Sequence, residues 1–176
     1  DRACAMQAMP TNEWVARKAA TAAATALADS GCDFLCGSTD EPAYLCVAES
    51  RGLRAAMWNL DMRRFGPNAY VSSVMLDFAP FYIEQVRARL NGTWKAAGNF
   101  LTMAHGVDRD IWGQTVPENV RTQADAMRDR ILAGYSPFQG PIRDNNGAIR
   151  IPAGATMNDM AIYQWDWGVQ GMTGLG

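Results

Sequence analysis

Short apolar runs alternate with helix-like segments along the first half of this chain, and this alternation most constrains the fold. CDFLC (32–36), the apolar part of LRAAMWNLDM (53–62) and AYVSSVML (69–76) have the length and composition of buried strands. Gly31 and Gly52 end the helical segments before the first two runs and leave only short links. Helices and strands that alternate with short links predict an α/β fold, with a parallel sheet flanked by helices.

Capping residues place the first two helices. Asn12 is the expected N-cap of an Ala-rich helix that ends at Gly31. Thr39 or Asp40 is the expected cap of a second helix that runs to about Ser50. Residues 1–11 are poorly patterned, and we treat them as a terminus outside the patterned region 12–176.

The third helix follows the third strand. Asp77 is its expected cap, Pro80 lies in its first turn and Asn91-Gly92 mark its end. NFLTMA (99–104) has the pattern of a weaker strand. The order of elements found in the first half therefore continues toward residue 104.

The last third of the chain predicts an amphipathic helix and a hairpin. In the helix, over Pro117–Leu132, one apolar stripe is formed by Val120, Ala124, Met127 and Ile131. The face expected in water carries Arg121, Asp125, Arg128 and Asp129. Asn146-Gly147 favours a type I′ turn between residues 141–143 and 148–150. The tail after it is rich in Met and Trp and is expected to be packed.

Length and charge narrow the class of protein. With 176 residues, the chain is long enough for one domain or a large lobe of a two-lobed protein. A formal net charge of -2 argues against a nucleic-acid partner, because such binders usually carry a basic excess. No apolar run reaches the roughly 18 residues of a membrane span. The first residues lack a signal-peptide layout, so we expect a cytoplasmic chain, a processed one or a fragment.

Enzyme motifs are absent from the sequence. Cys32 and Cys36 lie on an expected strand, where four residues at about 3.3 Å each separate the sulfurs by roughly 13 Å. That separation excludes a shared zinc ion or a disulfide, and buried structural thiols are expected. His105 is the single histidine, and a lone histidine is more often structural than catalytic. Without a nucleophile, a base or a metal site, the sequence favours a binding protein that uses no cofactor.

The end of the second strand carries the best candidate binding residues. Trp58, Asn59 and Asp61 follow its apolar part, and ligands of open α/β sheets bind beyond the carboxyl ends of the strands. A carboxylate and an amide beside an aromatic ring suit a small polar ligand with a flat face. Trp14 and Phe78 offer further flat surfaces. The alternative is structural, because Asp and Asn also bond to their own backbone in turns.

Several blocks of the chain resemble a known family. The blocks are ALADSGCDFLCGSTDEPA, NLDM followed by FGP, SSVMLDFAPFY, LNGTWK, SPFQGPIRDNNGAIRIPAG and WDWGVQGMTG. In this order and spacing, from about Asn12 to Gly174, they resemble the carboxyl-terminal half of the basic membrane protein family. These are substrate-binding proteins of bacterial ABC transporters with a type I periplasmic-binding fold. The family is about twice this length, so the resemblance implies one lobe without most of the amino-terminal lobe.

The resemblance also implies a set of ligand-binding residues. They are Asp61, Asn59, Trp58, Trp14, Thr39, Asp40, Asp77 and Phe78. Three positions depart from the family pattern. Val15-Ala16 and Ala104-His105 replace Asp-Pro and Lys-Asp, and no lysine lies near Leu76, where nucleoside-binding relatives hold the sugar. The last departure shifts the expectation from a nucleoside toward a free base such as adenine.

The function implied by the resemblance is purine uptake without catalysis. A purine base or nucleoside would bind between two lobes, and a permease of an ABC transporter would be the protein partner. The expected location is the periplasm or the outer face of the inner membrane, with membrane contact only through a lipid anchor upstream. Three alternatives remain open: a binding protein for another polar ligand such as a sugar, an α/β enzyme that acts on nucleosides, and a degenerate chain with a structural role.

Overall fold

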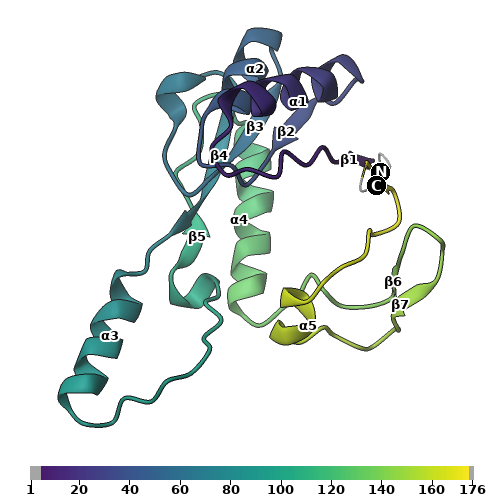
Figure 1. Ribbon diagram of the computed structural model, residues 1–176. Coiled ribbons are helices and arrows are strands. Elements are labelled where there is room, and N and C mark those ends of the chain that lie inside the picture. The colour runs from purple at the N-terminus through teal and green to yellow at the C-terminus, as the bar shows by residue number, and fades with distance from the viewer. Residues whose placement is uncertain (1–4, 175–176) are drawn as a thin grey trace. The chain divides into compact units, whose positions relative to one another are not determined.

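The computed structural model describes residues 5–174, and the chain divides into two compact units (Figure 1). One unit spans Thr11–Arg128, and the other combines Asp1–Pro10 with Asp129–Gly176. Among the described residues, no helix has both the length and the apolar character that crossing a membrane requires. The division expected between residues 11 and 12 stays a prediction.

A four-stranded sheet forms the centre of the larger unit. Its strands are β2 (Phe34–Cys36), β3 (Arg54–Trp58), β4 (Tyr70–Leu76) and β5 (Val107–Arg109), and they lie in this order. β2, β3 and β4 are parallel, whereas β5 runs antiparallel to β4. The expected α/β fold with a parallel sheet is confirmed, and the antiparallel edge strand is an addition to it.

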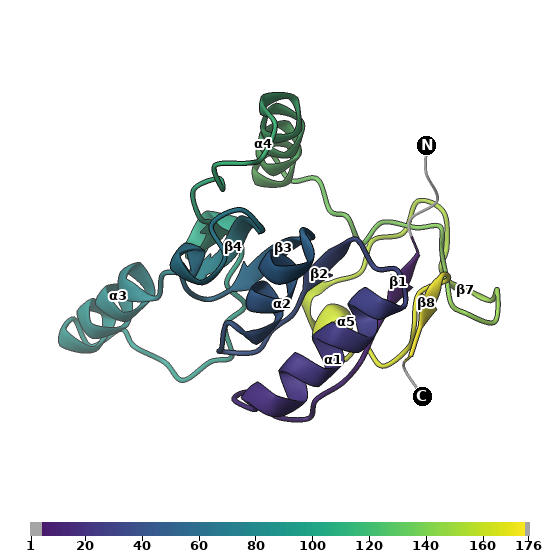
Figure 2. The ribbon, with the colours of Figure 1, turned by 90° about the horizontal axis from the view of Figure 1, so that it is seen from above.

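Helices α1 (Arg17–Asp29) and α2 (Ala43–Arg51) pack on each other, and α2 packs on β2 and β3 (Figure 2). Side chains of alternate strand positions point toward these helices, as the pleat requires. The resulting core consists of Ala24, Leu35, Tyr44, Leu45, Val47, Ala48, Ala55, Met57, Met62, Ala69 and Tyr70. On the other face of the sheet, Phe34 and Val74 are exposed. The small Ala side chains allow the helices to lie close to the strands.

The helix starts differ from the expected caps. Asn12 does not cap α1, which begins after Ala16, and its φ of 57° places it in an irregular segment before the helix. Thr39 and Asp40 do not cap α2 either. The residue before α2 is Pro42, and the carboxylate of Glu41 accepts a hydrogen bond from the Ala43 N–H at 3.2 Å. Glu41 lies one residue closer to the helix than Asp40, and its carboxylate reaches the N–H of Ala43, the first helical residue. Glu41 therefore stabilises the start of α2 in place of Thr39 or Asp40.

Helix α3 (Ala79–Leu90) has Pro80 in its first turn and Asn91 after its last residue, as expected, although its N-cap is Phe78 and not Asp77. It contains no buried residue, and Figures 1 and 2 both show it apart from the sheet. The strand expected over residues 99–104 is wrong. Residues 103–105 form a short 3-10 helix, and β5 begins later, at Val107, where its backbone can pair with the end of β4.

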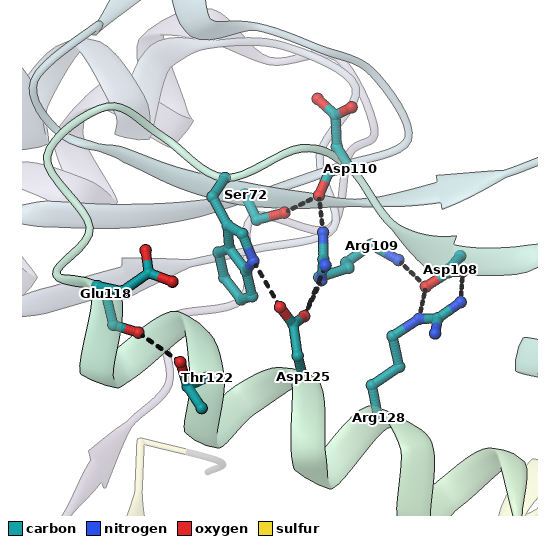
Figure 3. A network of polar contacts seen from close by, with 9 residues as sticks. Ser72, Asp108, Arg109, Asp110, Glu118, Thr122, Asp125 and Arg128 are labelled. Carbon is teal, nitrogen blue, oxygen red and sulfur yellow. Dashed lines mark hydrogen bonds and ion pairs between the residues drawn. The ribbon is translucent and has the colours of Figure 1, made fainter.

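Helix α4 (Glu118–Leu132) turns its charged face, not its apolar stripe, toward β5 (Figure 3). Asp125 accepts hydrogen bonds from Arg109 Nε at 2.8 Å and from Trp112 Nε1 at 3.2 Å, and Arg128 Nε donates to Asp108 at 2.7 Å. Val120 and Met127 are 45% and 40% exposed. The prediction that this charged face of α4 lies in water is therefore wrong. Charged residues of β5 pair with it, and no pattern within the helix sequence reveals these partners.

The smaller unit contains two short sheets. β1 (Met6–Gln7) pairs with β8 (Met172–Thr173), and β6 (Ile142–Arg143) pairs with β7 (Ile149–Ile151). A short helix, α5 (Asp159–Tyr163), follows, with the Asn158 side chain accepting from the Ala161 N–H. The packing expected for the tail is found only in part: the rings of Trp165 and Trp167 stack at 4.6 Å, whereas Met160 and Tyr163 are 50% and 77% exposed.

The expected hairpin is present, but its turn is not type I′. Gly147 has a φ of 81°, whereas Asn146 is not at positive φ. The Gly147 N–H donates to the Asp144 carbonyl, and the Asp144 N–H donates to the Ala148 carbonyl. This pattern indicates a turn followed by a glycine bulge. The Asp144 carboxylate stabilises it by accepting from the N–H groups of Asn146 and Ala148, which removes the need for a mirror-image turn.

We predict that Tyr70→Phe destabilises the chain by about 1 kcal/mol, the usual contribution of one hydrogen bond. The buried Tyr70 hydroxyl donates to Asp110 Oδ2 at 2.8 Å and links β4 to the segment after β5. Urea unfolding measures the change. Tyr82→Phe is the matched control, because Tyr82 is 59% exposed and its loss of a hydroxyl should change stability by less than about 0.5 kcal/mol. Equal effects of the two substitutions would contradict the role of this bond.

The Asp108–Arg128 pair predicts a pH-dependent contribution to stability. Hydrogen bonds from the Arg128 guanidinium hold the pKa of Asp108 below its ordinary value. A lowered pKa in the folded state gives stability that is complete above the unfolded pKa of about 3.9 and is lost as the pH falls through the folded pKa. Asp108→Asn should therefore lower the urea midpoint at neutral pH, and the difference should vanish in acid.

Asp33→Asn is the control for this experiment, since Asp33 is exposed. Its urea midpoint should follow that of the unmodified chain at every pH. A difference between the Asp108→Asn variant and the unmodified chain that stays constant from neutral pH to strong acid would show that the ion pair is not its origin.

Candidate functional site

Parallel pairing brings the ends of β2, β3 and β4 to one edge of the sheet. Cys36 pairs with Ala56 and Trp58 pairs with Val74, so the three strands run in the same direction and end near one another. Trp58 is the last residue of β3, and the loops that follow the strands carry six more of the eight expected residues: Thr39, Asp40, Asn59, Asp61, Asp77 and Phe78. Trp14 reaches the same edge, because its carbonyl accepts a hydrogen bond from the Asp40 N–H at 2.9 Å.

The chain turns sharply after β3. Asn59 has a φ of 66°, its N–H donates to the Val74 carbonyl at 2.7 Å, and the Leu60 N–H donates to the Trp58 carbonyl at 2.8 Å. A bond between residues two apart around a positive φ defines a γ-turn of the rare, strained kind. Within the described residues, the Asn59 carboxamide and the Trp58 indole N–H have no hydrogen-bond partner. Strain and unpaired polar groups therefore coincide at this strand end.

Asp61 is paired with Arg63, which begins the short 3-10 helix η1 (Arg63–Phe65). The Arg63 backbone N–H and Nε donate to Asp61 Oδ1 at 3.1 and 2.8 Å, and Nη2 donates to Oδ2 at 2.5 Å. Hydrogen bonds from the Arg63 side chain hold the pKa of Asp61 below its ordinary value. The carboxylate is thus ionised and oriented, and Oδ2, which accepts one hydrogen bond, retains a lone pair for a further donor.

A hollow of about 820 Å³ lies beside Asp61. Its lining consists of Leu60, Asp61, Met62, Arg63, Arg64, Phe65, Pro67, Trp112, Gln114 and Arg121. None of the other seven expected residues lines it. The segment around Gly113 follows β4 closely, since the Gly113 N–H donates to Val71 and a Cβ at Gly113 would lie 1.8 Å from the Tyr70 carbonyl oxygen. Only glycine permits this approach, which positions Trp112 and Gln114 at the wall.

The loop after β2 contains two buried polar atoms without partners. Thr39 Oγ1 and Glu41 Oε1 are inaccessible to solvent and make no hydrogen bond within the described residues. Glu41 is 6% exposed, and an unpaired buried polar group costs about 1–3 kcal/mol. Glu41 is not among the residues expected at the site, although an acidic residue between a strand end and a proline is the signal that would have found it. Asp40 is exposed beside them.

The residues after β4 have structural contacts that explain their types. The N-cap of α3 is Phe78 and not Asp77, but Asp77 Oδ1 accepts from the Ala79 N–H at 3.0 Å and stabilises the start of the helix from one position earlier. The Asp77 N–H donates to the Gly106 carbonyl at 2.7 Å. Phe78 is 39% exposed, and its ring lies 6.0 Å from that of Tyr82. Both residues lie at the same sheet edge as Asn59, and their contact with a ligand stays a prediction.

The cysteines and the histidine are not grouped for chemistry. Cys32, Cys36 and Cys46 are free thiols, and the expectation of buried thiols is wrong, because Cys36 is exposed and Cys32 and Cys46 are partly exposed. Cys4 lies outside the described residues. His105 Nδ1 lies 3.0 Å from the Thr102 hydroxyl. Among the described residues, no three His, Cys, Asp or Glu side chains are placed to hold a metal ion.

Comparison with known proteins gives relatives of one functional class. The chain is 31% identical over 162 residues to a purine-binding protein of Brucella abortus, an alignment that covers 92% of this chain and 46% of the relative. It is 33% identical over 122 residues to a putative ABC transporter glucose-binding protein of Haloferax volcanii, which covers 69% and 31%. Both relatives are named as proteins that bind a small molecule. This chain spans less than half the length of either relative, and no protein-family model matches it.

Solved structures support the fold alone. An ABC transporter solute-binding protein from Conexibacter woesei matches with a TM-score of 0.54 and 18% identity, over 70% of this chain and 43% of that one. A transcriptional activator of the comK gene from Bacillus halodurans matches with a TM-score of 0.58 and 20% identity, over 72% and 46%. The chain therefore shares its fold with part of each of these larger proteins.

We predict that Arg63→Gln raises the pKa of Asp61 toward the ordinary value of about 3.9. The substitution removes the guanidinium hydrogen bonds that favour the carboxylate, and the backbone N–H of residue 63 remains. Carboxyl ¹³C chemical shifts recorded across an acid titration measure this pKa. Arg64→Gln is the control, since Arg64 makes no ion pair with Asp61 and should leave the titration unchanged. An unchanged pKa in Arg63→Gln would refute the assignment.

Proposed function

We propose that the chain is one lobe of an ABC-transporter solute-binding protein and that the whole protein binds a purine. The supporting observation is the sheet edge at which three parallel strands end, with Trp58 as the last residue of β3 and Asn59 and Asp77 in the loops that follow β3 and β4. Ligands of open α/β sheets bind beyond such an edge. The relative named a purine-binding protein aligns with 92% of this chain, including this edge of the sheet.

The chemistry of the edge suits a purine. In the proposed site, Trp58, Trp14 and Phe78 provide flat surfaces for a purine ring, and Asn59 offers both a donor and an acceptor to its edge. Asp61 accepts from a ring N–H or an amino group while it remains bound to Arg63. The polar groups of Thr39, Asp40 and Asp77 complete the proposed set. A molecule without matching hydrogen-bonding groups would leave these polar atoms unpaired in the closed site. The free-energy cost of the unpaired atoms would make the site selective.

We infer a free base, with adenine favoured, instead of a nucleoside. Nucleoside-binding members of the basic membrane protein family, which the sequence blocks resemble, use a lysine near the position of Leu76. Leu76 is the last residue of β4, at the proposed edge, and it offers no hydrogen bond to a sugar hydroxyl. The adenine preference therefore depends on the proposed assignment to the basic membrane protein family, because both are inferred from the same sequence blocks.

A sugar is the second candidate ligand. The relative named a putative ABC transporter glucose-binding protein is 33% identical over 69% of this chain. Carboxylates and amides at a strand edge also bond to sugar hydroxyls, and aromatic rings pack against sugar faces. Both relatives are named as binding proteins and not as enzymes, and we propose no catalysis for this chain.

The proposed function places the whole protein outside the cytoplasmic membrane. It would deliver its ligand to an ABC permease, either free in the periplasm or attached to the outer face of the inner membrane by a lipid anchor. Closure of a second lobe over the sheet edge would bury the ligand. Nucleic acid has no part in this function.

Thermal unfolding with added adenine tests the proposal. A ligand that binds only the folded chain raises the midpoint, and at a concentration 100 times its Kd it stabilises the fold by about 2.7 kcal/mol. We expect adenine to raise the midpoint, adenosine to raise it less, and ribose to leave it unchanged. A rise with glucose and none with adenine would reverse the order of the two candidate ligands.

The substitution Asn59→Gly separates binding from stability. Glycine adopts the φ of 66° without strain, so we expect unchanged stability or a gain of up to about 1 kcal/mol, while adenine affinity falls at least tenfold, or about 1.4 kcal/mol. Asn12→Gly is a matched control, because Asn12 also has a positive φ, of 57°. If both variants bind adenine equally well, Asn59 does not contact the ligand.

A further inference from the structure

The hollow beside Asp61 has the size and lining of a binding site in its own right. Its volume of about 820 Å³ lies within the roughly 300–1,000 Å³ typical of small-molecule sites. It is bounded by the segment after β3 and by the segment after β5, which both belong to the larger unit. Apart from Asp61, the expected purine-binding residues do not line it.

The charge of the hollow is positive, although the chain as a whole has a net charge of -2. The charged side chains of the lining are Asp61, Arg63, Arg64 and Arg121. Asp61 and Arg63 neutralise each other through their bidentate pair. Arg64 and Arg121 form no ion pair among the described residues, while the Asp110 carboxylate, which also acts on Arg63, offsets part of the positive charge.

These two arginines are held differently. Arg121 Nε donates to the Val116 carbonyl at 2.8 Å and Nη2 donates to the Gly113 carbonyl at 3.1 Å, which orients the guanidinium and leaves Nη1 unpaired. Arg64 is exposed, and its guanidinium lies 4.7 Å from the centroid of the Phe65 ring. One cation is therefore preorganised, and the other can move toward a ligand.

Aromatic rings form part of the wall, and at least one of them is rigidly placed. Trp112 Nε1 donates to Asp125, and the guanidinium of Arg109 lies 4.5 Å from its ring centroid. Arg109 is itself bound to Asp125 (Figure 3). Phe65 is 40% exposed. Together with Gln114, the lining offers flat apolar surface, neutral hydrogen bonds and two cations.

We propose that this hollow is a second ligand site and that it takes an aromatic phosphomonoester. A phosphomonoester carries close to two negative charges at neutral pH and three acceptor oxygens, which match the positive charges of Arg64 and Arg121. The aromatic group of the ligand lies against Trp112 or Phe65. The site shares only Asp61 with the residues proposed for the purine, because Trp58, Asn59, Asp77 and Phe78 lie outside its lining.

Isothermal titration of the 176-residue chain with phenyl phosphate at low salt tests the site. We expect saturable binding at least tenfold tighter than that of inorganic phosphate, because only phenyl phosphate uses the aromatic wall. Phenol, which has the ring without the charge, should bind at least tenfold more weakly than phenyl phosphate. The affinity should fall as sodium chloride is added. No saturable binding, or equal affinity for phenyl phosphate and inorganic phosphate, would overturn the proposal.

Charge-removing variants identify the residues. Arg64→Gln should weaken phenyl phosphate binding at least fivefold, and Arg64→Lys should retain part of the affinity because it keeps the charge. Arg87→Gln is the control for the loss of one positive charge, since Arg87 is an exposed residue of α3 that does not line the hollow. Equal weakening by Arg64→Gln and Arg87→Gln would show that only long-range charge attracts the ligand, and would overturn the site.

Titration of the Asn59→Gly variant separates this site from the proposed purine site. That variant should bind phenyl phosphate with unchanged affinity, because Asn59 does not line the hollow. A chain that binds phenyl phosphate through Arg64 but ignores adenine would disprove only the purine proposal. A chain that binds adenine but gives no titration with phenyl phosphate would disprove only the second site.

Discussion

Parallel pairing of β2, β3 and β4 is the interaction on which the candidate site depends. Parallel strands place all their carboxyl ends at one edge, so loops that are separated by about twenty residues in the sequence meet there. The pairing is stabilised by the apolar core beneath it, where Leu35, Ala55 and Met57 face the helices. A loss of register by one residue would turn these side chains away from the core and would also displace the polar loops. Stability and the geometry of the edge therefore have the same origin.

Arginine–aspartate pairs organise the second side of the larger unit. Asp61 with Arg63 orients the segment after β3, and Asp108 with Arg128 attaches α4 to β5. Partly exposed pairs of this kind contribute little free energy individually. Their importance is geometric, because a bidentate guanidinium fixes the plane of a carboxylate. The same pairs leave Arg64 and Arg121 as the cations of the hollow that form no ion pair among the described residues, and this difference in pairing distinguishes that site from the sheet edge.

Prediction from the sequence succeeded where local pattern and burial agree. The strands over 34–36, 54–58 and 70–76 lie within the apolar runs, and Gly52 ends α2 in the left-handed conformation that glycine favours. It failed where a long-range partner decides the outcome. The expected strand at 99–104 lacks a neighbour with which to pair, and β5 forms three residues later, where β4 offers one. The charged face of α4 was expected in water, yet Asp108 and Arg109 bind it.

The sequence by itself determined the α/β class, the order of the first three strands and the polar residues that follow them, since these depend on hydrophobic periodicity and on turn-forming residues. Only the tertiary structure decided which of those residues lie together. Asp61 follows Asn59 by two positions, but the γ-turn at Asn59 and the pair with Arg63 direct it to a hollow whose other wall comes from residues 112–121. Contacts between segments about fifty residues apart depend on how strands pair and how side chains pack in three dimensions. A pattern within either segment cannot predict them.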